Sequence, residues 1–301
     1  MKAAIIEEKG LLDNIRIVEL PIPLIKPNEI LIKVKAAGVN PVDWKAVLNG
    51  IFKMPHIIGT DVSGIIEKVG TQITNFKEGD EIIGSLEWAT QGAFAEYITT
   101  EENFITHKPK NLNFKESAGI PLAALTAWQG LFDKLDIQPD QKVLIQAAAG
   151  GVGLFAVQFA KWKGAHVTGI ASEKNEAFLR EIGVDEIINY KTADFNSLKA
   201  DYDAVFDSMA SSENTFKILK HGGKYVSITA APSQELANQY GVKATNFLFH
   251  SNRHQLAQIV ELIESGSVNV YLDRTFNLDQ AQEALQYQKD GHSRGKNVII
   301  I

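Results

Sequence analysis

The sequence contains no cysteine, and this absence removes several kinds of chemistry. Without cysteine the 301-residue chain has no disulfide, no thiolate metal ligand and no cysteine nucleophile. It also has no apolar run near the ~20 residues that a membrane-spanning helix needs, so a membrane protein is not expected. The net charge is −6 and the lysines and arginines are dispersed. Without a basic stripe, nucleic acid is not an expected partner.

The first residues, Met1-Lys-Ala-Ala-Ile-Ile-Glu7, turn polar early and then have the pattern of a strand. This pattern fits neither a signal peptide nor a transit peptide, so we expect a cytoplasmic protein. With 301 residues, 45% of them hydrophobic, the chain is long enough for two cores.

The pattern of the chain changes at about residue 115. Before it, short apolar stretches alternate with Gly, Pro and Asn, which predicts a β-rich domain. After it, apolar strands alternate with helices, which predicts right-handed crossovers and a doubly wound parallel sheet of the α/β class. The predicted strands of this part are 143–146, 166–171, 186–190, 204–207 and 225–229, with helices at 152–163 and 173–182.

The tail from about residue 253 has a third pattern. It predicts a helix at 254–265, a strand at 274–276, a helix at 279–289 and a strand at 297–301. We expect this tail to rejoin the first domain, which gives a β-rich catalytic domain of residues 1–115 and 253–301 and a nucleotide-binding domain of residues 116–252. A ligand is expected at the carboxyl ends of the parallel strands, in the cleft between the two domains.

A glycine turn links the predicted strand at 143–146 to the helix that follows. The turn holds Ala149, Gly150, Gly151, Val152 and Gly153. Glycine lets the backbone approach a pyrophosphate, and the first helical turn directs unpaired N–H groups and a positive dipole end at the anion. Such turns also occur without a ligand, so the motif gains its weight from the strand and helix around it.

Several ordered motifs together are typical of one known family. They are Gly38-Val-Asn-Pro-Val-Asp43, Gly59-Thr-Asp-Val-Ser-Gly64, Gly92-Ala-Phe-Ala-Glu-Tyr97, Pro121-Leu-Ala-Ala-Leu-Thr-Ala127 and Asp203-Ala-Val-Phe-Asp207. Over essentially its whole length the chain resembles the medium-chain dehydrogenase/reductase superfamily, and within it the zinc-free quinone oxidoreductase and enone (alkenal) reductase branch. The resemblance implies a GroES-like β domain and a Rossmann domain.

The resemblance also bears on metal. Zinc members of the superfamily bind their metal through a Cys at the position of Asn40 and a His at the position of Thr60, and a catalytic zinc needs three protein ligands. We therefore expect no metal. Without a Lewis acid, simple alcohol oxidation is disfavoured. Hydride addition to a quinone or an enone leaves delocalised charge on oxygen, which hydrogen-bond donors stabilise.

The resemblance implies catalytic positions as well. Asn40 and Lys45 are expected to face the nicotinamide and the substrate, with Lys45 a donor to the developing enolate oxygen or to the nicotinamide ribose. A solvated loop lysine is the alternative for Lys45. Thr60 is expected to line the site, although Asn40 and Thr60 also suit turns. Thr126 matches a threonine at the nicotinamide end; its alternative is a helix-interior hydroxyl bonded to its own backbone. Asp43 is expected to order the loop after Pro41; direct catalysis is the alternative.

Cofactor choice depends on the end of the second strand of the predicted Rossmann sheet. NAD enzymes place an acidic residue there, about 20 residues past the glycine turn, where this chain has Ser172. A small hydroxyl leaves room for a 2′-phosphate, and Lys174 follows, so NADPH is the expected cofactor. Glu173 is an alternative acid, and the family's phosphate-binding lysine aligns with Asn175. Tyr190 matches a family tyrosine beside the adenosine phosphate; a solvated strand-end tyrosine is the alternative.

Together these observations predict a zinc-independent, NADPH-dependent reductase of a small-molecule substrate, either a quinone or the activated C=C of an α,β-unsaturated carbonyl. The alternative is a cofactor-binding protein without turnover, with a structural or RNA-binding role, which the acidic balance disfavours. Segment 242–249 has the pattern of an edge strand that pairs between subunits in relatives, so a homodimer is expected. Lys296 matches the family but receives no role.

Overall fold

The computed structural model describes residues 1–50, 53–87, 92–195, 197–291 and 293–301. The chain divides into two units. Unit 1 comprises Met1–Leu125, Ser251–Gly266 and Val270–Ile301, and unit 2 comprises Thr126–His250 and Ser267–Asn269. The division thus falls after residue 125 and not after residue 115, because helix α2 (Phe114–Ala118) packs on the strands of unit 1.

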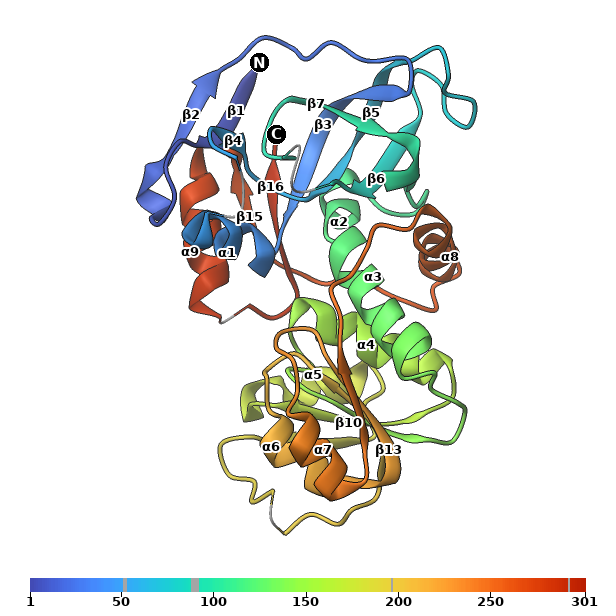
Figure 1. The fold of residues 1–301 in the computed structure, drawn as a ribbon. Helices are drawn as coiled ribbons and strands as arrows, with labels where there is room; N and C mark the ends of the chain where they lie inside the picture. The colour runs from blue at the N-terminus through green and yellow to red at the C-terminus, as the bar shows by residue number, and fades with distance from the viewer. Residues whose placement is uncertain (51–52, 88–91, 196, 292) are drawn as a thin grey trace. The chain divides into compact units, whose positions relative to one another are not determined.

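Unit 1 is built on β-sheets (Figure 1). Its main sheet, within the described residues, has the strand order β15-β16-β3-β5-β6-β8, with β7 paired to β3. A second sheet has the order β2-β1-β4. The strands are β1 (Lys2–Ile6), β2 (Ile15–Glu19), β3 (Glu29–Val39), β4 (His56–Ile57), β5 (Asp61–Val69), β6 (Glu81–Ser85), β7 (Tyr97–Glu101), β8 (Ile105–His107), β15 (Leu272–Asn277) and β16 (Lys296–Ile300).

The centre of unit 1 is the strand β3, which is buried along most of its length. It pairs antiparallel with β5, β7 and β16, so its neighbours cover both of its edges. The pairing with β16 sets Asn297 opposite Val39, which brings the C-terminal strand next to the segment that follows β3. The predicted return of the tail to the first domain is therefore found.

Unit 1 also contains helices. They are α1 (Pro41–Asn49), α2, most of α3 (Pro121–Trp128), α8 (Arg253–Glu264) and α9 (Ala281–Asp290). Helices α1 and α9 lie side by side (Figure 1). Helix α8 begins at an N-cap, Asn252, whose side chain accepts from the N–H groups of His254 and Gln255. Capping of this kind satisfies N–H groups that have no partner within the helix.

Unit 2 has a parallel sheet with helices between its strands. In the part of the chain that the structure describes, the strand order is β11-β10-β9-β12-β13-β14. This is the Rossmann order, with the reversal between β9 and β12, and it confirms the predicted fold class. The strands are β9 (Lys142–Ile145), β10 (His166–Ala171), β11 (Glu186–Asn189), β12 (Tyr202–Asp207), β13 (Leu219–Ser227) and β14 (Lys243–Asn246), and the α-helices are α4 (Gly151–Trp162), α5 (Glu176–Glu181), α6 (Ser212–Thr215) and α7 (Gln234–Tyr240).

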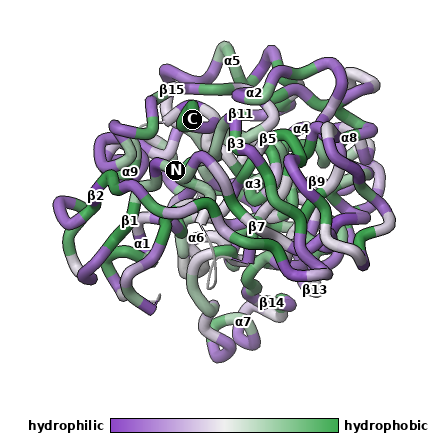
Figure 2. The backbone as a smooth tube through the Cα atoms, turned by 90° about the horizontal axis from the view of Figure 1, so that it is seen from above, coloured by the Kyte–Doolittle hydropathy of each residue, from purple (hydrophilic) through white to green (hydrophobic). Residues whose placement is uncertain are grey.

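Hydropathy follows this architecture. In Figure 2 the apolar helix α3 is mainly green, whereas α7, which is rich in Gln, Asn and Glu, is mainly purple. The burial of side chains agrees with this difference, because Ala237 is the buried residue of α7. Across the described residues, no helix combines the length and the apolar character that crossing a membrane would require.

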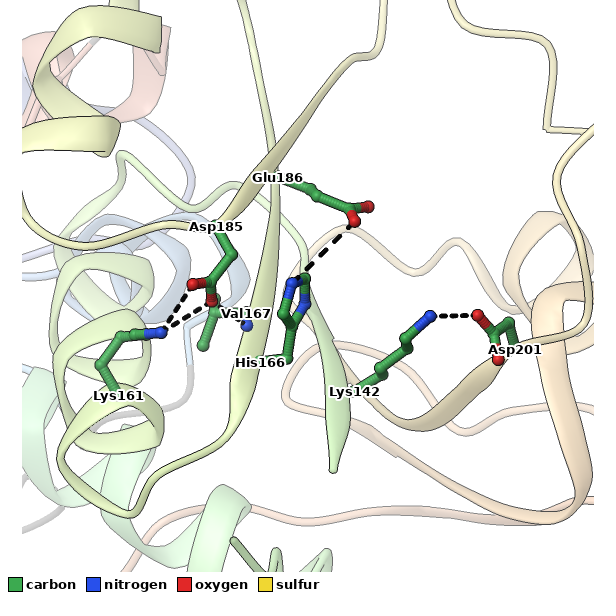
Figure 3. A network of polar contacts seen from close by, with 7 residues as sticks. All are labelled: Lys142, Lys161, His166, Val167, Asp185, Glu186 and Asp201. Atoms are coloured by element: carbon green, nitrogen blue, oxygen red, sulfur yellow. Dashed lines mark hydrogen bonds and ion pairs between the residues drawn. The ribbon is translucent and has the colours of Figure 1, made fainter. Parts of the chain in front are cut away.

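Charged pairs gather at the amino ends of the strands in unit 2 (Figure 3). Asp185 accepts from Lys161 Nζ at 2.7 Å and from the backbone N–H of Val167 at 2.7 Å, and Lys142 pairs with Asp201. These side chains are partly exposed, so water screens the pairs and their contribution to stability is small. They stand at the edge opposite the one where a Rossmann fold binds its ligand.

Candidate functional site

The glycine turn of unit 2 follows β9 directly. Ala147 has a positive φ of 46°, and its carbonyl accepts from the N–H of Gly150 at 2.8 Å. The N–H of Ala148 donates to Ile170 O of the neighbouring strand β10 at 3.0 Å, which fixes the turn to the sheet. Helix α4 then begins at Gly151, and its N-cap, Gly150, provides no side-chain hydrogen bond. The positive end of α4 thus stands at the carboxyl edge of the sheet.

Close packing explains why residue 153 is glycine. A Cβ atom there would lie 2.2 Å from Ala147 O and 2.8 Å from Ala148 Cα, which are backbone atoms of the turn. At Gly150 the nearest atom would be Ala147 O at 3.2 Å. The turn therefore has the shape that lets main-chain N–H groups approach a diphosphate, and these residues fit a dinucleotide. Ala149 is buried and Val152 is half-buried in the same turn.

The predicted adenosine-side residues lie at neighbouring strand ends. Ser172 follows β10 and Tyr190 follows β11, and the N–H of Tyr190 donates to Ala171 O at 3.3 Å. Ser172 Oγ accepts from Asn175 Nδ2 at 3.4 Å, so its hydroxyl hydrogen is free to turn outward. Tyr190 is 56% exposed and Lys174 is exposed. The structure thus brings Ser172 and Tyr190 together, with Lys174 in the 3₁₀ turn that begins after Ser172. Thr126 is buried in α3.

A buried polar network occupies the end of β3 in unit 1. Asn40 is 1% exposed, and its Nδ2 donates to Thr60 Oγ1 at 3.2 Å and to Asp61 Oδ2 at 2.9 Å. Its Oδ1 accepts from Lys296 Nζ, which also donates to Val39 O at 3.2 Å. An ammonium only donates, so it fixes the orientation of the Asn40 amide. The structure thus joins Asn40 and Thr60, two of the three predicted catalytic residues.

Asp43 holds the start of α1 in this network. Its Oδ2 accepts from the backbone N–H of Asn40 at 2.7 Å, and its Oδ1 accepts from Thr60 Oγ1 at 3.1 Å. These contacts agree with the expectation that Asp43 orders the loop. Both Nδ2 hydrogens of Asn40 and the hydroxyl hydrogen of Thr60 are directed into the network, so their predicted roles toward a substrate stay predictions.

Burial perturbs the ionisation of the network. Removal from water raises the pKa of Asp43 to about 7, with the neighbouring charge of Asp61 acting in the same direction. Burial likewise raises the pKa of Asp61 to about 6, against the opposing effect of the Lys296 ammonium. Burial lowers the pKa of Lys296, which is 4% exposed, while the two carboxylates act to raise it. The network therefore holds a cation and two carboxyl groups whose charge depends on pH near neutrality.

Lys45, the third predicted catalytic residue, lies apart from this network. It is on the exposed face of α1, and its Nζ lies 5.6 Å from the centre of the Trp44 ring. No ion pair to Lys45 occurs among the residues that the structure describes. Its ammonium is therefore available to a ligand, which is compatible with the predicted role and also with a solvated lysine.

The zinc-ligand positions do not fit a metal ion. Asn40 and Thr60 present an amide and a hydroxyl, and the amide oxygen already accepts from an ammonium, whose charge repels a metal cation. Over the described ranges, no group of three or more His, Cys, Asp or Glu side chains is arranged to hold a metal.

Sequence reasoning missed two residues. Lys296 received no role, yet it is a charged residue at the start of the last strand, and three of the four residues that follow it are apolar. Asp207 was named only as the last residue of a family motif and was given no role, although it is completely buried at the end of β12. An acidic residue that ends an apolar strand was the signal that would have singled it out.

A Rossmann sheet with a glycine turn, carried on one chain with a β-rich unit, defines a nucleotide-dependent oxidoreductase of the dehydrogenase type. Residues 26–110 match the alcohol dehydrogenase GroES-like domain family, and residues 182–299 match the zinc-binding dehydrogenase family. The chain belongs to the medium-chain dehydrogenase/reductase superfamily, as its motifs predicted.

Three similar proteins illustrate the relationship. The 2-methylene-furan-3-one reductase of Solanum lycopersicum is 35% identical over 99% of this chain and 79% of its own length. The chloroplastic NADPH-dependent alkenal/one oxidoreductase of Arabidopsis thaliana is 34% identical over the same shares, 99% and 79%. The solved structure of the quinone oxidoreductase from Coxiella burnetii has a TM-score of 0.92 and 32% identity, and the match covers 100% of this chain and 99% of that one.

Proposed function

We propose that the chain is an NADPH-dependent reductase that transfers hydride to a quinone or to the activated C=C of an α,β-unsaturated carbonyl. The observation that carries the proposal is the glycine turn after β9, packed so closely at Gly153 that no side chain fits there, with the first turn of α4 directly in it. The names of the similar proteins, which include a quinone oxidoreductase and an NADPH-dependent alkenal/one oxidoreductase, support the same activity. They do not favour a protein without turnover.

Specific residues would hold the cofactor. The turn from Ala149 to Gly153 and the start of α4 suit the diphosphate, because they offer N–H groups and a positive dipole end. Ser172 leaves space for a 2′-phosphate, and the exposed cation of Lys174 and the hydroxyl of Tyr190 stand nearby in the fold. These features support NADPH over NADH.

The chemistry then needs little from the protein beyond positioning and one donor. NADPH supplies the hydride when it is bound. Lys45 is the residue that we assign to the developing negative charge on the substrate oxygen, since its ammonium is exposed and forms no ion pair with a described residue. Asp43 fixes the first turn of α1, the helix that carries Lys45, through the N–H of Asn40. No metal takes part, since Asn40 and Thr60 do not fit one.

The proposal is tested with the purified protein and a panel of acceptors. We expect NADPH oxidation, followed by absorbance, with quinones, enones or enals, a weaker rate with NADH, and none with simple ketones. If NADPH binds but no acceptor is reduced, the alternative of a cofactor-binding protein without turnover is correct. A salt-sensitive gel shift with RNA at near-neutral pH would favour that alternative too.

We also propose a homodimer formed through β14. This strand is the edge of the sheet, and it is paired on one side only within the described residues. The segment that follows it exposes Leu248, 84% accessible, which a partner would cover. Light scattering coupled to gel filtration should give twice the 33.1 kDa mass, and a proline at Thr245 should reduce it to one chain. Localisation in the cytoplasm stays a prediction, tested by cell fractionation.

A further inference from the structure

Asp207 is the last residue of β12, and its buried carboxylate gathers a loop around itself. Its Oδ1 accepts from the N–H of Met209 at 2.6 Å. Its Oδ2 accepts from the N–H of Ser211 at 2.6 Å and from Ser211 Oγ at 2.9 Å. The hydroxyl of Tyr225, on the neighbouring strand β13, also donates to Oδ2. The carboxylate thus binds two backbone and two side-chain donors in the described residues, and these bonds determine the course of residues 208–211.

The loop has a conformation that needs this support. Ala210 adopts a positive φ of 56°, which is unfavourable for a residue with a Cβ atom. Burial raises the pKa of the Tyr225 phenol, and its hydrogen bond to Asp207 acts in the same direction. Tyr225 therefore keeps its hydroxyl hydrogen near neutral pH and donates it to Asp207.

A second set of bonds ties the loop to the start of the glycine turn. Gln146, the residue directly after β9, donates from Nε2 to Ser211 Oγ at 2.6 Å. In return Ser208 Oγ donates to Gln146 O at 3.2 Å. Ser211 Oγ therefore accepts from Gln146 while it donates to Asp207. The loop and the glycine turn form one hydrogen-bonded structure across the reversal between β9 and β12.

The position of the loop indicates which part of a dinucleotide it meets. In a Rossmann fold the diphosphate lies at the glycine turn after the first strand and the adenosine ribose at the end of the second strand. Those strands are β9 and β10 here, and β12 lies on the other side of β9. The half of the cofactor beyond the diphosphate must therefore extend over the end of β12. The loop presents Met209 there, with 63% of its surface exposed.

We propose that Asp207 is a positioning residue for the nicotinamide half of the cofactor, acting through loop 208–211 with Met209 at its tip. Asp207 touches no ligand itself; it holds the loop in the conformation that receives the nicotinamide riboside. This proposal rests on the proposed function, because it assumes that the dinucleotide binds in unit 2.

The experiment compares a whole cofactor with a part of it. Binding of NADPH and of 2′-phospho-ADP-ribose, which lacks nicotinamide, is measured by calorimetry for the natural protein and for Asp207→Asn. The amide keeps the size of the carboxylate but sets N–H groups against the N–H groups of the loop. We expect the Kd for NADPH to rise about tenfold, which is about 1.4 kcal/mol, and the Kd for the fragment to change less than about twofold.

Two further variants and a control make the result interpretable. Asp185→Asn is the matched control: that carboxylate also accepts from a backbone N–H, of Val167, but at the opposite edge of the sheet. It should leave both affinities unchanged. Tyr225→Phe and Ser211→Ala each remove one hydroxyl that donates to Asp207 and should weaken NADPH binding selectively, by smaller factors. They carry the test if Asp207→Asn does not fold.

The outcomes separate the possible failures. Equal weakening of both ligands, or no weakening of either, would overturn the role of Asp207. If the natural protein binds neither NADPH nor the fragment, the proposed function itself is wrong. A selective loss of NADPH affinity in Asp207→Asn, Tyr225→Phe and Ser211→Ala, with unchanged binding in Asp185→Asn, supports the proposal.

Discussion

Gly153→Ala is the sharpest test of the nucleotide site, because its steric effect can be worked from the structure. An alanine Cβ at residue 153 would lie 2.2 Å from Ala147 O, although real Cβ atoms essentially never approach an atom closer than 3.0 Å. The carbonyl must therefore recede by at least 0.8 Å, the difference between these distances. This carbonyl is part of the backbone of the turn that would hold the diphosphate, so moving it changes the shape of the turn. Overpacking of this kind costs about 1–3 kcal/mol, more than the roughly 1 kcal/mol that alanine gains over glycine in a helix.

The assay is calorimetric titration of NADPH together with thermal unfolding. If the displaced turn loses about 1–3 kcal/mol of binding free energy, Kd rises roughly 5- to 150-fold. Gly150→Ala is the matched control in the same turn, because its Cβ would lie 3.2 Å from the same oxygen and its φ of −80° suits alanine. It should weaken binding much less. Equal affinities of Gly153→Ala and the natural protein, or a larger loss in Gly150→Ala, would refute the steric argument.

Three other variants test the remaining assignments. Ser172→Asp places a carboxylate where the 2′-phosphate is expected, so the ratio of kcat/KM with NADPH to that with NADH should fall about tenfold or more; an unchanged ratio would mean that the phosphate lies elsewhere. Lys45→Ala should lower kcat/KM for every good acceptor by about tenfold or more, since one donor to a developing oxyanion is removed, whereas Lys33→Ala, an exposed lysine on β3, should not. Asp43→Asn tests the buried network through pH. Burial raises the pKa of Asp43 from 3.8 to about 7, so between about pH 4 and 7 the folded chain holds a proton that the unfolded chain has released. The free energy of unfolding from this group therefore falls as pH rises through that window, and the variant should show a smaller fall in urea titrations at pH 5.5, 6.5 and 7.5. Parallel pH dependences would contradict the assignment.

Unit 2 could be predicted from the sequence because its order is local. Each strand is an apolar run followed by a helix, so segment 166–171 coincides with β10 and the Rossmann class follows from the alternation. Differences arise where local signals conflict. The helix predicted from 173 begins with a 3₁₀ turn and becomes α5 only at Glu176. Strand β13 starts at Leu219, earlier than the predicted 225, because Gly222 and Gly223 inside it have the pattern of a turn.

The network of unit 1 could be predicted only in part, because distant segments build it. Asn40 and Thr60 were found by resemblance to positions that bind zinc in other members. Lys296 was not assigned, because its contact with Asn40 depends on the pairing of β16 with β3, which joins residues from opposite ends of the chain. Long-range pairing of this kind leaves no periodicity in the sequence.

The same network shows why a metal ion does not fit at this place. By resemblance, zinc members hold a cation between the positions of Asn40 and Thr60. Here the cation beside Asn40 is the Lys296 ammonium, which faces the carboxyl groups of Asp43 and Asp61. The Asn40 amide links the ammonium to a carboxyl group, since its Oδ1 accepts from Lys296 Nζ and its Nδ2 donates to Asp61 Oδ2. A fixed ammonium can hold the loop and the start of α1 in place, and two of its three N–H donors are used for this, by Val39 O and Asn40 Oδ1. Unlike a bound metal, it has no open coordination position for a substrate oxygen. The proposed function therefore takes its electrophile from another residue, the exposed Lys45, and uses an acceptor in which the negative charge that develops on hydride addition is delocalised.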